Sequence, residues 1–306
     1  MLTSFFSKSK PINYIVVGLY MLTLYIIAHY KRGFELETIA IVLFVLGAIL
    51  YIVPMLLLSV VVQRNDITDK GTYTILLYAF LTGILPGALT NINVLLAGFL
   101  VMLGLQNLLH LRNEKHIKAK IFNASIYICL ASLAFFWSIG FMALIFLAIS
   151  YFEPKNYRNW IIPVIGLLMI YLFANCFTLL FYDSFFSFQE YIDPISFSFE
   201  SYLAKDQLFS VGVLSICLIF FLGIYLLKFS RKPANIKPIL RLIIAYLIIT
   251  VAIAITSPQN NVSELFFVAI PLAIIGTTYL EMQFHEFAKE INIWVFLLIP
   301  FTTLLF

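Results

Sequence analysis

The chain has 306 residues, a length that allows one or two soluble domains, but 62% of its residues are hydrophobic and only 11% are charged. In a soluble domain about 25% of all residues are charged, because its surface is hydrated. The composition of this chain therefore excludes a soluble domain and indicates that the surface of the protein faces lipid. The net charge of +4 is small, and Lys and Arg lie in short segments between apolar runs, which gives no basis for a nucleic-acid partner.

Apolar runs predict membrane-spanning helices, because about 20 helical residues cross the hydrocarbon core of a bilayer. In chain order, clear runs lie at 12–30, 38–62, 92–111, 160–182, 208–228, 239–256 and 263–280. The first run ends in Lys31-Arg32 and has no signal-peptide cleavage site, so we expect an uncleaved span.

Three further apolar regions are less regular. The run 72–87 is short and ends in Leu85-Pro86-Gly87. The run 121–152 is too long for one helix, and we expect two short helices with a break near Ser138-Ile139-Gly140. The last run, 291–306, is also short.

The distribution of Lys and Arg predicts the topology. If 121–152 crosses twice and the other two irregular regions cross once, there are eleven spans, and 16 of the 19 Lys and Arg residues fall on the side of the N-terminus. Because cytoplasmic loops retain these residues, we expect a cytoplasmic N-terminus and an external C-terminus. The predicted fold is a single all-α domain over 1–306, a polytopic transmembrane helical bundle without a soluble domain.

One predicted external loop, 183–207, is both acidic and aromatic. Its Ile-Ser-Phe-Ser-Phe alternation would place apolar groups on one side and hydroxyls on the other. We expect the loop to lie in the membrane interface with its aromatic rings toward lipid. A lid over an external cavity is the alternative.

Polar side chains gather at both ends of the fourth predicted span. The candidate residues for binding a substrate or lipid are Asn91, Asn93, Gln106, Asn107, His110 and Arg112. Helical spacing places Gln106 and Asn107 on one face with His110. Together with Arg112 and the lysines that follow it, this face could bind a phosphate headgroup. Hydrogen bonding between helices is the alternative.

The Leu85-Pro86-Gly87 sequence, with Asn91 and Asn93 after it, predicts a broken or re-entrant segment at the outer face. Irregular backbone at that depth is tolerated only against protein or a wet cavity. The segment therefore favours a cavity there, although a tight turn between short helices explains it equally well.

The carboxylates at the predicted outer edge are candidates for catalysis. Glu35 and Glu37 lie in the first external loop, where a carboxylate can act as a base or bind a metal. A solvated loop is the alternative, and we interpret Glu264 as solvated as well. No Asp, Glu, Lys or Arg lies near the middle of a predicted span, which weakens the case for ion-coupled transport.

The sequence predicts no cofactor and no metal site. The three cysteines lie inside apolar runs without CxxC spacing. There is no Walker A loop, dinucleotide-binding glycine motif, HExxH or GxSxG.

The opening Thr3-Ser-Phe-Phe-Ser-Lys-Ser-Lys-Pro-Ile-Asn13 resembles an uncharacterised family, a domain of unknown function, among polytopic inner-membrane proteins of Bacteroidota. The likeness extends through 86–93 and 121–152. It implies a bacterial inner membrane and no established activity. More distantly, short paired helices after a basic loop are similar to membrane glycosyltransferases that use polyprenyl-phosphate sugars. In that superfamily an acidic residue of the first external loop is a base or metal ligand, and Glu35 or Glu37 would match it.

Three functions follow as hypotheses. The first is handling of a lipid-linked envelope precursor, by glycosyl transfer, polymerisation or flipping, with membrane lipid or a polyprenyl-phosphate-linked substrate as the partner. The second is a non-catalytic subunit or scaffold of an envelope assembly, bound to protein partners. The third is a facilitator or secondary transporter of a small solute.

Overall fold

The computed structural model describes residues 2–305 apart from 34–36, 70, 114, 196, 198, 200, 258–261 and 283–285. Every regular element within these residues is a helix, and no strand occurs among them. The predicted all-α fold is therefore confirmed for the described part of the chain.

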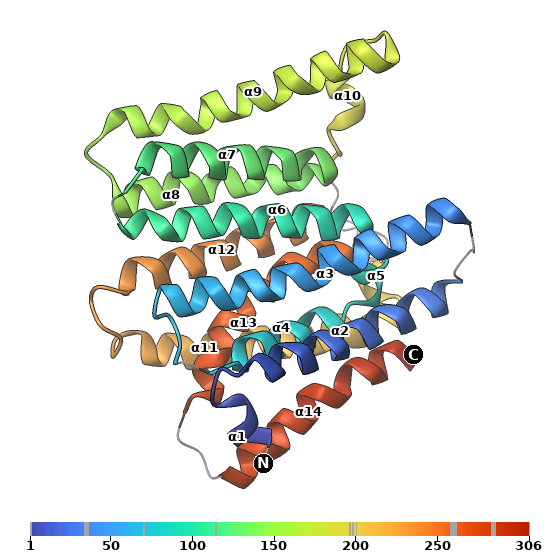
Figure 1. Ribbon diagram of the computed structural model, residues 1–306, viewed down its shortest axis with the longest axis vertical. Coiled ribbons are helices and arrows are strands. Elements are labelled where there is room, and N and C mark those ends of the chain that lie inside the picture. The colour runs from blue at the N-terminus through green and yellow to red at the C-terminus, as the bar shows by residue number, and fades with distance from the viewer. Residues whose placement is uncertain are drawn as a thin grey trace.

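The helices follow the predicted apolar runs (Figure 1). The long helices are α2 (Pro11–Arg32), α3 (Thr38–Arg64), α6 (Ile92–Leu109), α7 (Ile117–Ala134), α9 (Tyr157–Tyr182), α11 (Lys205–Phe229), α12 (Lys237–Thr256), α13 (Phe266–Leu280) and α14 (Glu286–Leu305). The shorter helices are α1 (Leu2–Phe6), α4 (Tyr73–Gly83), α5 (Pro86–Leu89), α8 (Met142–Phe152) and α10 (Phe188–Tyr191). Single 3-10 turns are η1 (His110–Asn113), η2 (Phe136–Phe141), η3 (Ser201–Leu203) and η4 (Ser263–Leu265).

Nine helical stretches in the described residues are long and apolar enough to cross a membrane, and Tyr73–Gly83 and Phe136–Phe152 are shorter apolar stretches. Each of the eleven predicted spans therefore corresponds to a helix. The helices support a multi-pass membrane protein, while the number of crossings stays a prediction.

The region 121–152 forms two helices, as predicted, and the break between them, residues 135–141, contains the predicted Ser138-Ile139-Gly140. The chain leaves helical geometry at Phe135, whose φ of −143° and ψ of 105° are extended, and η2 then leads into α8. The ring of Phe135 stacks on Phe267 of α13, with centroids 5.5 Å apart. This packing stabilises the extended residue at which the break begins.

Two helices lie in the centre of the bundle. Every residue of α4 is buried, as is all of α13 except Tyr279. The hydroxyl of Thr277 donates to Thr74 across this pair at 3.0 Å. At about 1.5 Å per residue, α4 is only about 16 Å long, roughly half of the hydrocarbon core. The surrounding helices allow this, because the ends of α4 meet protein and not lipid.

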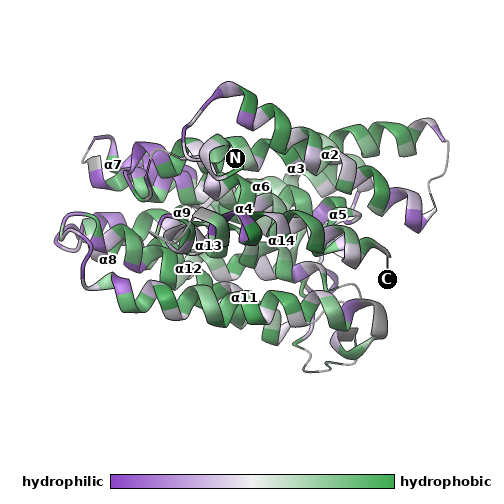
Figure 2. Cartoon of the chain, turned by 90° about the horizontal axis from the view of Figure 1, so that it is seen from below, coloured by the Kyte–Doolittle hydropathy of each residue, from purple (hydrophilic) through white to green (hydrophobic). Residues whose placement is uncertain are grey.

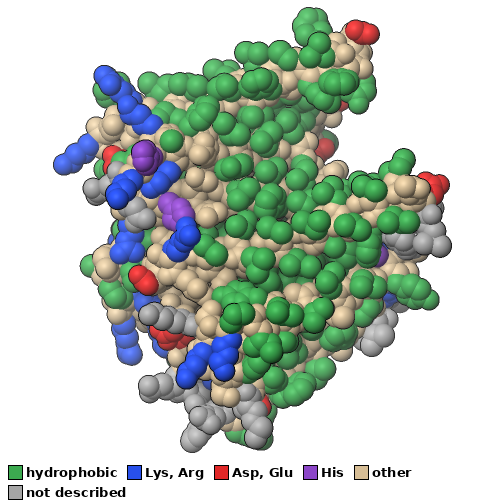
Figure 3. Space-filling view, viewed as in Figure 1, with side chains coloured by type: hydrophobic (Ala, Val, Ile, Leu, Met, Phe, Trp, Pro, Cys, Tyr) green, Lys and Arg blue, Asp and Glu red, His purple; other side chains and the backbone are tan. Residues whose placement is uncertain are grey.

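The outer helices present apolar side chains to the surroundings, and hydrophilic residues concentrate at the helix ends (Figure 2). Lys and Arg side chains gather along one edge of the molecule, at the ends of α6 and α11 and the starts of α7 and α9 (Figure 3). We call this edge the basic end. The other edge, the opposite end, holds α5, α10 and η4.

The first described helix, α1, packs against the start of α14, and α14 then runs toward the opposite end (Figure 1). The backbone N–H of Leu2 donates to Glu290, in the first turns of α14, at 3.3 Å. Thr303, near the other end of α14, lines a cavity together with Arg32 at the opposite end. An odd number of membrane crossings requires this arrangement.

The described part of the 183–207 loop is attached to the bundle through Tyr191. Its hydroxyl donates to Ser132 of α7 at 2.9 Å and also lies 2.7 Å from the hydroxyl of Tyr171 in α9. Phe185 and Phe197 of the same loop are largely exposed. Exposed aromatic rings are compatible with a loop that lies in the membrane interface. The position of the 183–207 loop relative to a membrane stays a prediction.

Candidate functional site

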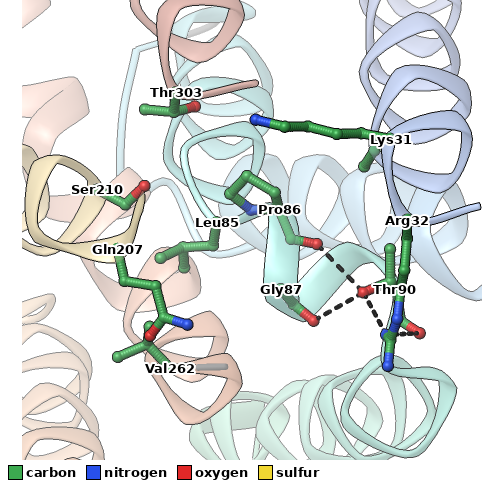
Figure 4. A pocket seen from close by; sticks show the side chains of 11 residues that line it. Lys31, Arg32, Leu85, Pro86, Gly87, Thr90, Gln207, Ser210, Val262 and Thr303 are labelled. Atoms are coloured by element: carbon green, nitrogen blue, oxygen red, sulfur yellow. Dashed lines mark hydrogen bonds between the residues drawn. The ribbon is translucent and has the colours of Figure 1, made fainter. Parts of the chain in front are cut away.

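A cavity of about 240 Å³ lies at the opposite end, where the chain breaks between α4 and α6 (Figure 4). We call it the helix-break cavity. Its polar lining consists of Lys31, Arg32, Thr90, Gln207, Ser210 and Thr303. The sequence predicted a broken segment with a cavity at this place, and Leu85, Pro86 and Gly87 do line one.

The local backbone explains the break. Helix α4 ends at Gly83, and Leu85 takes a non-helical conformation with φ of −110° and ψ of 74°. Proline at position 86 cannot continue the α4 hydrogen-bond ladder, but its fixed φ suits the first position of α5. The chain then turns again at Thr90 and Asn91 before α6 begins.

Arg32 connects the end of α2 to this break. Its Nη1 donates to the Thr90 hydroxyl at 2.7 Å and to the Thr90 carbonyl at 3.3 Å. The hydroxyl in turn donates to the Gly87 carbonyl at 3.2 Å. Lys31 extends across the cavity toward Thr303 (Figure 4). The cavity therefore combines a fixed guanidinium with an ammonium that reaches into it.

Helix α11 supplies the other polar wall. Ser210 is buried, and its hydroxyl has no hydrogen-bond partner among the described residues. Buried hydroxyls are normally hydrogen-bonded, and this one lines a cavity, so it is available as a donor and acceptor for a ligand. Gln207, one turn earlier, lines the same cavity.

A second cavity, of about 360 Å³, lies on the other side of the Arg32–Thr90 contact. The last turns of α2, with His29, and the first turns of α3, with Phe44, line this cavity together with other residues. The Nδ1 of His29 lies 3.1 Å from the carbonyl of Tyr25, one turn earlier in α2. Because both cavities share Arg32 and Thr90, a ligand in either would contact the same guanidinium.

A buried carboxyl lies nearby in η4. Glu264 is fully buried, and the hydroxyl of Tyr202 donates to its Oε1 at 2.5 Å and to the Ala254 carbonyl at 3.1 Å. Burial, and next the adjacent Glu264, raise the pKa of Tyr202 far above its ordinary value, so it stays a donor. Our interpretation of Glu264 as solvated is therefore wrong, since Glu264 is fully buried and Tyr202 donates to it.

The family comparison covers the whole chain. The chain belongs to DUF6427, a family of unknown function. The family model matches residues 1–306. Comparison with curated proteins and with solved structures returned no match. The predicted membership of a family without an established activity is thus confirmed, while the bacterial source and the likeness to glycosyltransferases stay predictions.

Of the two asparagines predicted as ligands in this DUF6427 chain, Asn91 makes structural contacts through its side chain. The Oδ1 of Asn91 accepts from the backbone N–H groups of Asn93 at 3.2 Å and Val94 at 3.4 Å, which caps α6. Its Nδ2 lies 3.5 Å from the hydroxyl of Ser263, beside Glu264. Neither Asn91 nor Asn93 lines the helix-break cavity.

Of the two predicted carboxylates, only Glu37 is described, and it does not line the second cavity. Glu35 lies outside the described residues. Glu37 is exposed and precedes α3, and its carboxylate has no hydrogen-bond partner in the described part of the chain. The loop that carries both joins Gly33 to Ala40, two residues that line the second cavity.

The polar cluster at the end of α6 is not one assembled site. The Nδ2 of Asn107 donates to the Leu103 carbonyl of its own helix at 2.8 Å. Arg112 donates to the Asn65 carbonyl at 3.4 Å, and the His110 carbonyl accepts from the ammonium of Lys120 at 2.6 Å. Gln106 is half-buried on the same helix. The Lys120 contact joins α7 to the end of α6, whereas the Asn107 contact stays within its own helix, and lipid binding by this face stays a prediction.

Sequence reasoning missed Lys31, Arg32, Gln207, Ser210 and Thr303 as site residues. One signal was present, because Lys31 and Arg32 are two of only three cations predicted on the external side. Cations that oppose the loop bias need a partner or a function. The other three residues carry no such signal.

Proposed function

We propose that this DUF6427 protein handles a lipid-linked envelope precursor in a bacterial inner membrane, and that the helix-break cavity binds the precursor's phosphate. The observation that carries the proposal is the pair of cations at a helix break, in a cavity whose opposite wall carries the buried hydroxyl of Ser210. Glycosyl transfer, polymerisation and flipping all require such a binding step.

The charge of the lining selects an anion. Lys31 and Arg32 line the cavity together, and no Asp or Glu does so among the described residues. A guanidinium binds phosphate oxygens through directed N–H donors, whereas an ammonium binds as a compact charge. The Ser210 hydroxyl adds a donor from the opposite wall.

The size of the cavity fits a headgroup. At about 240 Å³ it is smaller than the roughly 300–1,000 Å³ of pockets that enclose whole drug-sized ligands. A phosphate with its first sugar or linker atoms fits this space, while an isoprenoid chain stays in the surrounding lipid.

In the catalytic form of this proposal, Glu35 or Glu37 acts as the base. Both lie in the loop that joins the two helices lining the second cavity. Glu35→Gln and Glu37→Gln should each abolish activity while the protein still accumulates. Normal envelope glycans and lipids in both variants would contradict a catalytic role and leave phosphate binding intact.

The first experiment is native mass spectrometry of the protein extracted gently from its own membrane. We expect a bound polyprenyl-phosphate or glycolipid, and a roughly tenfold lower occupancy in Lys31→Gln, because a charge-assisted contact is lost. Lys10→Gln, which removes an exposed charge at the basic end, is the matched control. Equal loss in both variants, or no lipid in the wild type, would overturn the proposal.

A second function, a scaffold subunit, is favoured by helix α9. Its second half projects beyond the rest of the bundle (Figure 1). Leu172, Phe173, Phe177 and Leu180 are all more than half exposed there. Such a helix offers an apolar surface to a partner helix as well as to lipid. A stoichiometric protein partner without a polyprenyl lipid in the same spectra would favour this function.

A further inference from the structure

A separate cavity, of about 410 Å³, lies at the basic end where three helix termini meet. Its lining comes from the first turn of α7 (117–119) with His116, and from Glu153, Asn156 and Asn159. We call it the α7–α9 cavity. It is remote from the helix-break cavity, at the other end of the bundle.

Two helices begin at this cavity. The residues that precede α7 and α9, His116 and Asn156, make no side-chain cap to their helices. The first N–H groups of a helix have no partner within it, and a helix start carries a partial positive charge. Two uncapped helix starts on one cavity therefore favour an anionic group, and Lys118 adds a full positive charge.

Asn159 is the independent indication of a ligand. Only 1% of its surface is exposed, it lines the cavity, and its Oδ1 has no hydrogen-bond partner among the described residues. Leaving such a group unsatisfied costs about 1–3 kcal/mol, and an amide can turn either its oxygen or its NH₂ toward a bound group. A bound ligand would satisfy it.

The third helix terminus at the cavity, the C-terminal end of α8, has the reverse polarity. Helix α8 ends at Phe152, and Glu153 follows it, with its backbone N–H donating to the Ile149 carbonyl at 2.8 Å. A helix C-terminus carries a partial negative charge, and the Glu153 carboxylate adds to it. One side of the cavity thus suits an anion and the other suits a cation.

We propose that the α7–α9 cavity binds a phosphoethanolamine group. The phosphate lies at the starts of α7 and α9 with Lys118 and Asn159, and the ammonium lies at the end of α8 with Glu153. Such a zwitterion satisfies both polarities, whereas a simple anion would leave Glu153 unpaired beside it. The group can come from a phosphatidylethanolamine lipid or from a free phosphoethanolamine.

The test measures binding to the full-length protein by native mass spectrometry in a detergent without phosphate. Short-chain phosphatidylethanolamine and phosphatidylglycerol are titrated separately. Lys118→Gln should weaken binding of both lipids about tenfold, while Lys115→Gln, an equal charge loss outside the cavity, should not. Glu153→Gln should weaken phosphatidylethanolamine alone and so remove the preference for it over phosphatidylglycerol.

Competition then identifies the source of the ligand. Displacement of the lipid by free O-phosphoethanolamine means that the site binds the headgroup from either source, and its failure to compete restricts the site to the lipid. Inorganic phosphate competing as well as O-phosphoethanolamine would overturn the zwitterion assignment. An unchanged lipid preference in Glu153→Gln, or equal effects of Lys115→Gln and Lys118→Gln, would overturn the site itself.

Discussion

Glu281 follows the last turn of α13 at the basic end, where the backbone N–H of Asp69 donates to its Oε1 at 2.7 Å. Burial first, and then the nearby Asp69 carboxylate, raise the pKa of Glu281 to about 7, although Lys232 and Lys289 oppose this change. The folded protein therefore binds a proton here that the unfolded chain releases at lower pH.

This proton makes stability depend on pH. The contribution of this proton to the free energy of unfolding is fully present below about pH 4.5, the ordinary pKa of the group. It is lost as the pH rises through about 7, the pKa of Glu281 in the folded protein. We expect thermal stability in detergent to fall over this window in the wild type, by on the order of 2–3 kcal/mol. Glu281→Gln keeps the acceptor for Asp69 and should flatten the profile. Asp66→Asn, an exposed neighbour with a positive φ that Asn tolerates, is the control and should leave the profile unchanged.

The Tyr202 hydroxyl fixes the 183–207 loop to the bundle through Glu264 and the Ala254 carbonyl. Tyr202→Phe removes both contacts and should lower stability by about 1–3 kcal/mol, because a buried polar group loses its donor. Tyr182→Phe, which removes a hydroxyl from a largely exposed ring, should change stability little. Equal melting temperatures for the two variants would contradict a fixing role for Tyr202.

At the scale of elements, the contact between α7 and α9 depends on a glycine. A Cβ added at Gly166 would lie 2.6 Å from the Cβ of Ser125, an atom close to the backbone that cannot turn away. Small residues allow such close approach between helices in membranes. Since α9 also carries Asn159, its position determines the shape of the α7–α9 cavity.

Gly166→Ala should therefore destabilise the protein by about 1–3 kcal/mol, because overpacking must separate the two helices. Gly223 in α11 has no atom within 4 Å of an added Cβ, so Gly223→Ala should be neutral or stabilise by up to about 1 kcal/mol through helix propensity. Heat-induced unfolding of both variants checks this. A stable Gly166→Ala would show that α9 packs more loosely than the structure has it.

The helices could be predicted from the sequence because the length of an apolar run is a local property. Even the short α4 and the α7–α8 pair followed from it, although the packing of Phe135 against Phe267, where the break between α7 and α8 begins, has no local signal. The helix-break cavity was predictable only in part, through Pro86 and its neighbours. Ser210 and Thr303 reach it from distant parts of the chain, and no local pattern encodes that convergence.

For the whole molecule, the arrangement of the ends bears on the number of crossings. Nine and eleven spans both place the termini on opposite sides, so a reporter at residue 306 cannot distinguish them. The side of the membrane on which the loop after α6 lies does distinguish the two numbers of spans. If α4 crosses, this loop is on the same side as the loop after α3, and the Arg112 contact to the Asn65 carbonyl joins these two loops directly.

Cysteine labelling of a variant without the three native cysteines tests this topology. In intact spheroplasts, an impermeant thiol reagent should modify Glu37→Cys and Leu203→Cys, both exposed at the opposite end, but not Asp66→Cys or Lys115→Cys at the basic end. The last two should react only after permeabilisation, since the positive-inside bias predicts that their loops are cytoplasmic. If intact spheroplasts show labelling of the Lys115→Cys variant but not of the Asp66→Cys variant, α4 does not cross the membrane. It would also place the α7–α9 cavity on the external side, and the phosphoethanolamine group would then have to come from the outer leaflet.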